Sequence, residues 1–297
     1  MNREKSLFKN TIIITIGKIC TQLITFLLLP LYTGILTTAE YGTVDLLNTL
    51  VSLCLPIITL QIEQAVFREL LEVRNKEQEI KDIISSAIFT VIVQSIIFLI
   101  LFVIVAPAFK NVYKYFLATN VIAYIFSSLF LQITRGLGNS KKYAFASFIS
   151  ALCTILFNIL FIVGIKLGAK GMLLGTMLGQ MITVIYLFIS LRLYKYISIK
   201  NNKKKITKKL LKYSIPLIPN AISWWVFNAS DRLIVTAILG VEKNGILAAS
   251  LKFSTVYITL YNVFNISWTE SISTAIDDED LSTYFNKTFN VIIKLFI

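Results

Sequence analysis

Eight apolar stretches of this 297-residue sequence are each long enough to cross a lipid bilayer. A helix needs about 20 apolar residues to span the hydrocarbon core. The stretches lie at residues 11–36, 44–66, 83–107, 115–134, 143–165, 171–191, 213–239 and 245–270, and a ninth begins near 285. Because hydrocarbon offers no partner to backbone polar groups, each stretch must fold as a helix. The sequence therefore predicts an all-α fold, a polytopic transmembrane helical bundle.

Ionisable residues lie inside these apolar stretches, at Lys18, Glu63, Asp231, Arg232 and Lys252. A charge in the middle of a membrane span costs on the order of 3 kcal/mol or more. Such a residue is normally retained only where it faces the bundle interior or a water-filled path. These positions therefore indicate a polar cavity within the membrane, and this cavity is the expected functional site.

Composition excludes several classes of function. The chain is 56% hydrophobic and 15% charged, with a mean hydropathy of +0.74. Its net charge of +13 does not indicate nucleic-acid binding, because the basic residues lie between apolar spans rather than on a polar domain. The absence of histidine excludes histidine-based catalysis, metal sites and proton relays. Cys20, Cys54 and Cys153 form no metal or redox motif, so we expect no cofactor and no metal site.

The distribution of basic residues predicts the orientation of the chain. With a cytoplasmic N-terminus, 19 of the 29 lysine and arginine residues fall in cytoplasmic segments. This bias is typical of multi-pass proteins of the cytoplasmic membrane. The segment at residues 192–212 is the most basic, and we interpret it as an anchor on the anionic lipids of the inner leaflet.

Weak internal similarity suggests two related halves. Residues 33–36 (TGIL), followed by Gly42, match residues 236–239 (TAIL), followed by Gly245, at one offset of 203 residues. Two six-helix lobes of this kind occur in transporters built from parallel repeats, although chance similarity between apolar segments is an alternative. The predicted organisation is an N-terminal six-helix lobe at 1–194, a basic linker at 195–212, and a partial C-terminal lobe at 213–297.

Polar residues recur on one helical face in four spans. The stripes are Thr11, Thr15, Lys18, Gln22 and Thr25 in the first span, Asp45, Asn48, Ser52, Pro56, Thr59 and Glu63 in the second, Asn220, Trp224, Asn228 and Asp231 in the seventh, and Lys252, Thr255, Thr259, Asn262 and Thr269 in the eighth. Residues three or four apart share a helix face. We therefore expect these four spans to line the cavity and the third to sixth spans mostly to scaffold it. Gly171, Gly175 and Gly179 predict close helix packing there.

Several of these segments resemble a known family. Residues 29–33 (LPLYT) and 38–42 (TAEYG) resemble the exit of the first span in bacterial polysaccharide and O-antigen lipid flippases. Trp224, residues 228–232 (NASDR), Gly245 and Lys252 resemble the seventh and eighth spans of the same family. This family belongs to the multidrug/oligosaccharidyl-lipid/polysaccharide exporter superfamily.

The resemblance implies a two-lobed flippase. Such a protein moves a polyprenyl-pyrophosphate-linked oligosaccharide across the cytoplasmic membrane by alternating access, for the biosynthesis of a surface polysaccharide such as O-antigen or capsule. Its expected partners are the lipid-linked oligosaccharide, membrane lipids, and the glycan polymerase and glycosyltransferases of the same pathway. The sequence ends where the ninth span is expected to cross, so the second lobe is expected to be truncated.

The site residues follow from what a pyrophosphate and a sugar chain require. The substrate-binding candidates are Lys18, Gln22, Trp224, Asn228, Asp231, Arg232, Lys252 and Asn262. The three basic residues are expected to attract the pyrophosphate, the amides to bind sugar hydroxyls, and the indole to stack on a sugar ring. Asp231 is expected to pair with Arg232 in the empty state. Asp45, Glu63 and Asp231 are the candidates for coupling transport to an ion gradient, although Glu63 also fits an ordinary interface position.

Other functions compete with this hypothesis. A drug or metabolite exporter of the same superfamily would need a more acidic or aromatic cavity, and an inactive remnant would need none. A membrane-embedded glycan polymerase or glycosyltransferase would need a large outer loop or a cytoplasmic domain with paired carboxylates, and the sequence has neither. We therefore expect a transporter with no catalytic residues rather than an enzyme.

Overall fold

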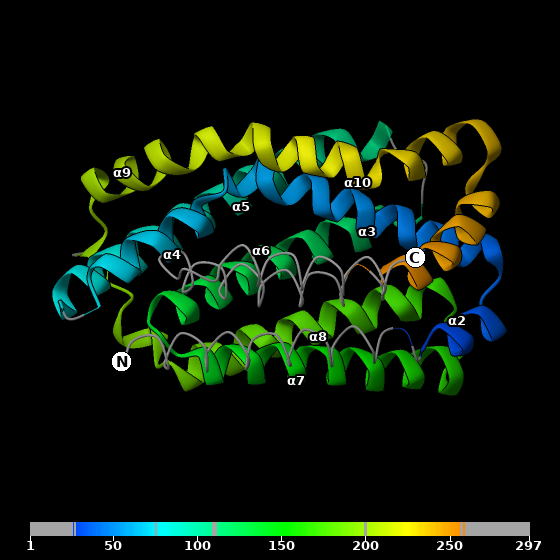
Figure 1. Cartoon of the computed structure of the whole chain (residues 1–297), viewed down its shortest axis with the longest axis horizontal. Coiled ribbons are helices and arrows are strands. Elements are labelled where there is room, and N and C mark those ends of the chain that lie inside the picture. Colours follow the sequence, from blue (N-terminus) through cyan, green and yellow to red (C-terminus); the bar gives the residue numbers. More distant parts are fainter. Residues whose placement is uncertain are drawn as a thin grey trace, which may run out of the picture. The chain divides into compact units, whose positions relative to one another are not determined.

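The computed structural model describes residues 26, 28–74, 76–108, 112–198, 201–255 and 258. Every regular element within these ranges is a helix (Figure 1). Residues Met1–Lys252 form one compact unit and Phe253–Ile297 form another. The helices described below belong to the first unit.

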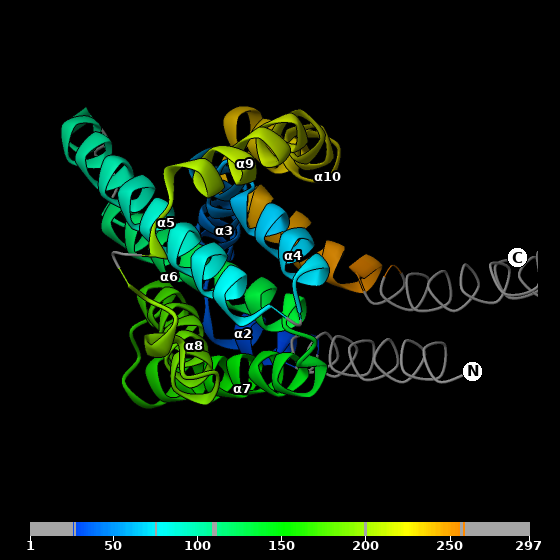
Figure 2. The ribbon, with the colours of Figure 1, turned by 90° about the vertical axis from the view of Figure 1, so that its left-hand side faces the viewer.

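Eight long or medium helices and several short ones follow one another along the described part of the chain. They are α2 (Leu29–Ile35), α3 (Thr38–Thr59), α4 (Ile62–Glu72), α5 (Glu77–Val105), η1 (Ala106–Ala108), α6 (Lys114–Gly136), α7 (Ser140–Asn158), the π-helical η2 (Ile159–Gly164), α8 (Ala169–Ser190), η3 (Leu193–Lys195), α9 (Lys204–Ser214), η5 (Ile215–Leu217) and α10 (Ile218–Leu239). Residues 241–255 are also helical. In both ribbon views α7 and α8 lie on one side of the bundle, α9 and α10 lie on the opposite side, and α3 to α6 lie between them (Figures 1 and 2).

Five helices in the described ranges are long and apolar enough to cross a membrane, namely α3, α5 with η1, α6, α7 with η2, and α8. They correspond to the second to sixth predicted spans. The seventh predicted span is helical as η5 and α10, but Asn228, Asp231 and Arg232 lower its hydropathy. The greater part of the first span lies outside the described residues, and α2 forms its end. The end of the eighth span and the start of the ninth also lie outside them.

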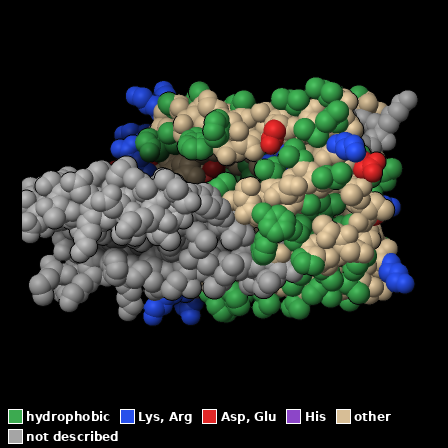
Figure 3. Space-filling model, turned by 45° about the vertical axis from the view of Figure 1, so that its right-hand side comes forward, with side chains coloured by type: hydrophobic (Ala, Val, Ile, Leu, Met, Phe, Trp, Pro, Cys, Tyr) green, Lys and Arg blue, Asp and Glu red, His purple; other side chains and the backbone are tan. Residues whose placement is uncertain are grey.

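The surface agrees with a position in the membrane. Figure 3 shows one face, on which lysine and arginine side chains gather mainly toward the two ends and apolar and neutral groups cover most of the middle. Large apolar side chains point outward along α5, where Val103 and Ile104 are each 69% exposed. Contact of such apolar side chains with lipid tails has no free-energy cost, whereas their exposure to water does.

The predicted second span has different bounds in the structure. It was expected at 44–66, but α3 begins at Thr38 and ends at Thr59, and α4 follows as a separate helix. Leu60 and Gln61 interrupt the helix with left-handed φ values of 51° and 57°. Pro56 weakens the last turn, since proline has no N–H to donate. Gln94 Nε2 of α5 donates to the freed Thr59 carbonyl oxygen at 3.2 Å, which stabilises the break.

The start of α3 is held by a capping box. The Thr37 side chain accepts from the Glu40 backbone N–H, and the Glu40 carboxylate accepts from the Thr37 backbone N–H. Glu40 Oε1 also accepts from the backbone N–H of Ala169 at the start of α8, at 3.4 Å. Glu40, one residue of the motif at 38–42, thus joins the ends of two helices.

Two glycines allow α3 to touch the helix at residues 241–255. A Cβ at Gly42 would lie 2.1 Å from the Val241 carbonyl oxygen, and a Cβ at Gly245 would lie 1.9 Å from the Thr38 carbonyl oxygen. The buried Asn244 donates from Nδ2 to the Gly42 carbonyl oxygen at 3.0 Å. These glycines are the pair matched by the offset of 203 residues, so the matched positions pack directly against each other.

The predicted glycine packing is confirmed between α7 and α8. A Cβ at Gly175 would lie 2.0 Å from Asn158 Oδ1, and one at Gly179 would lie 2.0 Å from Thr154 Oγ1. A Cβ at Gly171 would lie 3.0 Å from the Phe161 side chain in η2. The backbones of these two helices approach so closely because α8 has no side chain on that line.

Candidate functional site

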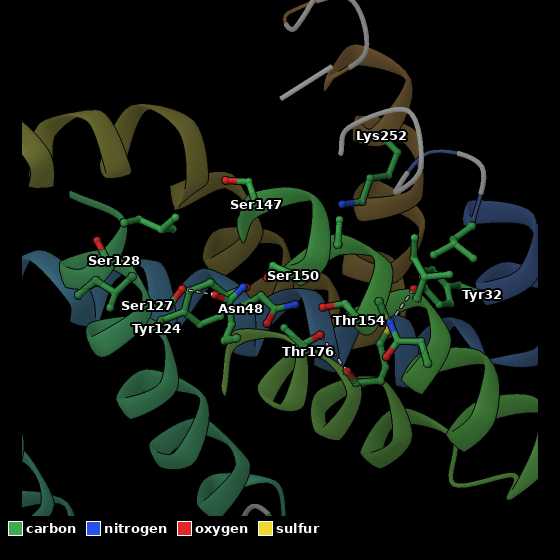
Figure 4. Close-up of a pocket in the computed structure, with 18 of the residues that line it drawn as sticks. Tyr32, Asn48, Tyr124, Ser127, Ser128, Ser147, Ser150, Thr154, Thr176 and Lys252 are labelled. Atoms are coloured by element: carbon green, nitrogen blue, oxygen red, sulfur yellow. Dashed lines mark hydrogen bonds between the residues drawn. The ribbon is translucent and has the colours of Figure 1, made fainter. Parts of the chain in front are cut away.

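A cavity of about 550 Å³ opens among α3, α6, α7 and α8 (Figure 4). Its polar lining consists almost entirely of hydroxyl and amide groups. The polar lining residues are Tyr32, Tyr41, Asn48, Tyr124, Ser127, Ser128, Gln132, Tyr143, Ser147, Ser150, Thr154, Asn158, Thr176, Gln180 and Lys252. A site of this size fits a small ligand or one part of a larger one.

The largest share of the polar lining comes from one face of α7. Tyr143, Ser147, Ser150, Thr154 and Asn158 follow one another at intervals of three or four residues, so they share a face of the helix. Figure 4 shows Ser147, Ser150 and Thr154 directed into the same cavity. The rule that identified the stripes of the second and seventh spans would also have identified this one.

The neighbouring helices complete the lining. Tyr124, Ser128 and Gln132 of α6 are spaced four residues apart, as are Thr176 and Gln180 of α8. The third to sixth spans were expected mostly to scaffold the cavity, but the fourth, fifth and sixth supply much of its lining. Sequence inspection gave weight to charged residues and so missed hydroxyl stripes on helices without a central charge.

Hydrogen bonds hold part of this lining in place. Ser127 Oγ donates to Gln180 Oε1 at 2.7 Å, which joins α6 to α8. Asn158 Nδ2 donates to Tyr32 Oη at 2.7 Å, which joins α7 to α2. Within the part of the chain that the structure describes, the buried Oδ1 atoms of Asn48 and Asn158 accept no hydrogen bond. Both oxygens are shielded from solvent, and Asn158 Oδ1 packs against the backbone of α8 at Gly175.

Among its described lining residues, the cavity has one positive charge and no negative charge. Lys252, on the helix at residues 241–255, is the charged residue among its described lining residues, and no aspartate or glutamate occurs among them. Figure 4 shows the Lys252 side chain directed from that helix toward the hydroxyl groups of α7. The arrangement suits a ligand that is neutral and polar, with an anionic group near the lysine.

An ion pair lies between α3 and α10. Arg232 Nε is 3.1 Å from Asp45 Oδ2, and the two side chains are 21% and 16% exposed. Lys252 also interacts electrostatically with Asp45. Arg232 was expected to pair with Asp231, but Asp231 is exposed and its Oδ1 accepts from the Arg232 backbone N–H at 2.8 Å. Adjacent residues on a helix point about 100° apart, so Arg232 reaches the neighbouring helix instead.

The two tryptophans of α10 differ in their contacts. Trp224, the predicted stacking residue, is 61% exposed and packs edge-on against Phe227. Asn228 is also exposed, and its Nδ2 donates to the Trp224 carbonyl oxygen at 2.7 Å. Trp225, which the sequence analysis did not single out, donates from Nε1 to the Thr49 carbonyl oxygen and to Ser52 Oγ, each at 3.0 Å. Trp225 therefore faces α3, and Trp224 and Asn228 are not among the residues that line the cavity.

The remaining candidates are not brought together with Lys252. Glu63 is buried in α4, is 7% exposed, and is not among the lining residues of the cavity. Lys18, Gln22 and Asn262 lie outside the described residues. Within the described ranges, no three His, Cys, Asp or Glu side chains gather in a group that could hold a metal ion.

Comparisons with known structures agree on the fold. The structure resembles "Outward-facing conformation of a multidrug resistance MATE family transporter of the MOP superfamily" with a TM-score of 0.62 at 15% identity, covering 98% of this chain and 76% of that one. It resembles a MOP superfamily transporter from Pyrococcus furiosus Vc1 with a TM-score of 0.62 at 15% identity, covering 95% and 74%. It also resembles "MATE in complex with MaL6" with a TM-score of 0.59 at 16% identity, covering 92% and 71%.

Comparison at the level of sequence identifies the family. Residues 7–268 match the family described as "Polysaccharide biosynthesis protein". The comparison with curated proteins gave no match. The match covers most of the chain, and two of the structural neighbours are described as transporters of the MOP superfamily. The chain is therefore a multi-pass membrane protein that belongs to the polysaccharide biosynthesis protein family and has the fold of MOP superfamily transporters.

Proposed function

We propose that this chain moves a polyprenyl-pyrophosphate-linked oligosaccharide across the cytoplasmic membrane by alternating access. The observation that carries the proposal is the cavity with its hydroxyl and amide lining, in which the described residues include one lysine and no carboxylate. Membership of the polysaccharide biosynthesis family supports the same cargo class. The surface polysaccharide would be of the O-antigen or capsule type.

The lining suits the two polar parts of such a cargo. Sugar hydroxyls both donate and accept hydrogen bonds, and serine, threonine and tyrosine hydroxyls match them in either direction. The amide side chains that line the cavity, among them Gln132 and Gln180, would add further donors and acceptors for sugar O–H groups. The Lys252 ammonium would offset part of the pyrophosphate charge, and the lipid tail would stay in the bilayer. At about 550 Å³ the cavity would hold one part of the head group rather than a whole glycan.

The pair of Asp45 and Arg232 would act as a switch in this cycle. Arg232 would bind a phosphate oxygen only after it leaves Asp45, which is 3.1 Å away in this conformation. Asp45 would then be free to take a proton or a sodium ion, which makes it a candidate for coupling together with Glu63 and Asp231. Lys18, Gln22, Trp224, Asn228 and Asn262 stay candidates for later contacts with the cargo.

The orientation belongs to the same proposal. The N-terminus and the basic segment before α10 would lie in the cytoplasm, where the glycosyltransferases supply the cargo. A glycan polymerase would receive it on the other side. Protease protection of a tag at either end in sealed vesicles would test this orientation.

One observation favours a second candidate, an exporter of cationic drugs. Four tyrosines, Tyr32, Tyr41, Tyr124 and Tyr143, line the cavity, and the faces of aromatic rings attract cations. The lysine in the same cavity opposes this function, because it would repel a cation without a nearby carboxylate in the lining to compensate.

Binding measurements on the purified chain distinguish the two candidates. The wild-type chain in lipid nanodiscs is titrated with a polyprenyl-pyrophosphate-linked disaccharide and, separately, with ethidium. We expect Lys252→Gln to weaken binding of the lipid-linked disaccharide about tenfold or more, since a hydrogen bond to a charged group contributes about 1.5–3 kcal/mol. Lys243→Gln is the matched control, because Lys243 is an exposed lysine of the same helix.

Two results would overturn the proposal. One is equal binding of the disaccharide by the Lys252→Gln variant and the wild type. The other is tight binding of ethidium that improves when Lys252 is neutralised, which would assign the cavity to cationic drugs.

A further inference from the structure

Two lysines, one directly before α9 and one within it, fix this helix to the bundle. Lys203 forms an ion pair with Asp82 of α5, and Lys209 forms one with Glu69 of α4. Both carboxylates are buried, with side chains only 6% and 9% exposed. A buried carboxylate needs a partner, so these two pairs set the position of α9.

Three other lysines of α9 line a groove instead of pairing with these two carboxylates. Lys204, Lys208 and Lys212 are spaced four residues apart and form one row along α9. All three are exposed and line a groove between α5 and α9. Among the described residues, none of the three forms an ion pair with an acidic side chain. The row therefore presents positive charge without an acidic partner among the residues that the structure describes.

The floor of this groove is apolar. Phe89 and Val93 of α5 face Leu211 of α9 and Ile215 of η5, and the groove has a volume of about 650 Å³. Val93 is 54% exposed and Ile215 is 47% exposed, so both contribute open apolar surface. At the floor, a hydrogen bond joins α5 to α9 between Thr90 Oγ1 and Thr207 Oγ1, which lie 3.4 Å apart.

The groove runs along α5 from a charged end toward an apolar region. At one end Ser86 Oγ accepts from the Lys203 backbone N–H at 3.0 Å. Further along, the contact between Thr90 and Thr207 follows, and beyond Val93 the helix continues with Ile96 and Ile97, both about half exposed. A ligand lying in this groove would thus meet lysines beside apolar surface that faces the bilayer.

We propose that the groove between α5 and α9 is a binding site for an anionic phospholipid of the surrounding membrane. Its phosphate would sit against Lys204, Lys208 and Lys212, and one acyl chain would cover Val93 and Ile215. Charge complementarity selects the head group, and apolar burial selects a lipid over a free phosphate. The site is separate from the hydroxyl-lined cavity and does not depend on the transported cargo.

This site differs from general attraction of a basic segment to an anionic membrane. General attraction depends on the number of lysines near the surface, whatever their direction. The groove requires particular lysines, since only one face of α9 lines it. Variants that remove the same charge from different places therefore separate the two cases.

The test is native mass spectrometry of the whole 297-residue chain in detergent, titrated with phosphatidylglycerol or phosphatidylcholine. We expect one saturable phosphatidylglycerol per chain and at least tenfold weaker binding of phosphatidylcholine. The triple variant Lys204→Gln, Lys208→Gln and Lys212→Gln should lose at least tenfold in affinity for phosphatidylglycerol. The matched triple variant Lys141→Gln, Lys195→Gln and Lys205→Gln removes three exposed lysines outside the groove and should change that affinity less than twofold.

A filled groove gives an independent measurement. Thr207→Trp keeps every lysine but places an indole on the floor, so it should also reduce phosphatidylglycerol affinity about tenfold. This variant keeps the proposal testable if the triple lysine variant does not fold. Equal losses in the two triple variants, or full binding by Thr207→Trp, would overturn the site. Displacement of the lipid by millimolar glycerol 3-phosphate would overturn the lipid assignment and indicate a site for soluble phosphate.

Discussion

The contact between α7 and α8 and the contact between α3 and α10 are formed by different kinds of residue. In the first, Gly171, Gly175 and Gly179 let the two helices approach until backbone meets side chain. In the second, a few long polar side chains join the helices, chiefly in the ion pair of Asp45 and Arg232. A glycine-packed contact has one geometry, whereas polar side chains can exchange partners. The comparison identifies the second contact as the one better suited to open and re-form.

The largest effect should come from disturbing the glycine-packed contact. Gly175→Ala places a Cβ 2.0 Å from Asn158 Oδ1 and 3.0 Å from the Asn158 backbone nitrogen. Overpacking of this kind costs about 1–3 kcal/mol, and loss of the Asn158 hydrogen bond adds to it. We expect a clear fall in the thermal unfolding temperature of the detergent-solubilised chain.

Gly34→Ala is the control for that variant. A Cβ at Gly34 has no neighbour within 4 Å, and alanine is favoured over glycine in a helix by about 0.5–1 kcal/mol. This change should leave stability unchanged or raise it slightly. A Gly175→Ala variant as stable as wild type would show that α7 and α8 are not held in this close contact.

An intermediate effect is expected from the ion pair between α3 and α10. A double-mutant cycle with Asp45→Asn and Arg232→Gln should give a coupling of about 1–2 kcal/mol in thermal unfolding, because both side chains are mostly shielded from water. The same cycle with Asp231→Asn and Arg232→Gln should give no measurable coupling, since Asp231 is exposed. A larger coupling for Asp231 than for Asp45 would reverse the pairing described above.

The smallest effect is expected from the indole that joins the same two helices. Trp225→Phe removes hydrogen bonds to the Thr49 carbonyl oxygen and to Ser52 Oγ, which together contribute about 1 kcal/mol. Trp224→Phe should change stability by less than about 0.5 kcal/mol, because Trp224 is largely exposed. Comparable losses in both variants would contradict the finding that Trp225, rather than Trp224, joins α10 to α3.

The helices themselves were largely predictable. Spans two to six were expected at nearly the positions at which they occur, because a long apolar stretch has no other stable form in hydrocarbon. The bounds of the second span were not, since the break at Leu60 and Gln61 has no glycine to mark it. Its stabilising contact comes from Gln94 on another helix, which inspection of the local sequence does not include.

The candidate site was predictable only in part. Lys252 was expected to face a polar cavity, and it does line one. The hydroxyl stripe of α7 was present in the sequence, but a stripe of serine and threonine is compatible with helix packing as well as with a cavity. The structure shows that it serves both purposes, because the stripe lines the cavity while Thr154 and Asn158 also pack against Gly179 and Gly175 of α8.

The amino-acid sequence alone determined that this chain is a membrane-spanning helical bundle and to which family it belongs, because hydropathy and short motifs are local properties. Only the tertiary structure decided that Arg232 meets Asp45, that Trp225 rather than Trp224 faces α3, and that the cavity is lined mainly by hydroxyl groups. Partner choice depends on the rotation of each helix about its axis. That rotation is set by the packing of the whole bundle, through contacts such as those of Gly42 with Val241 and Gly175 with Asn158.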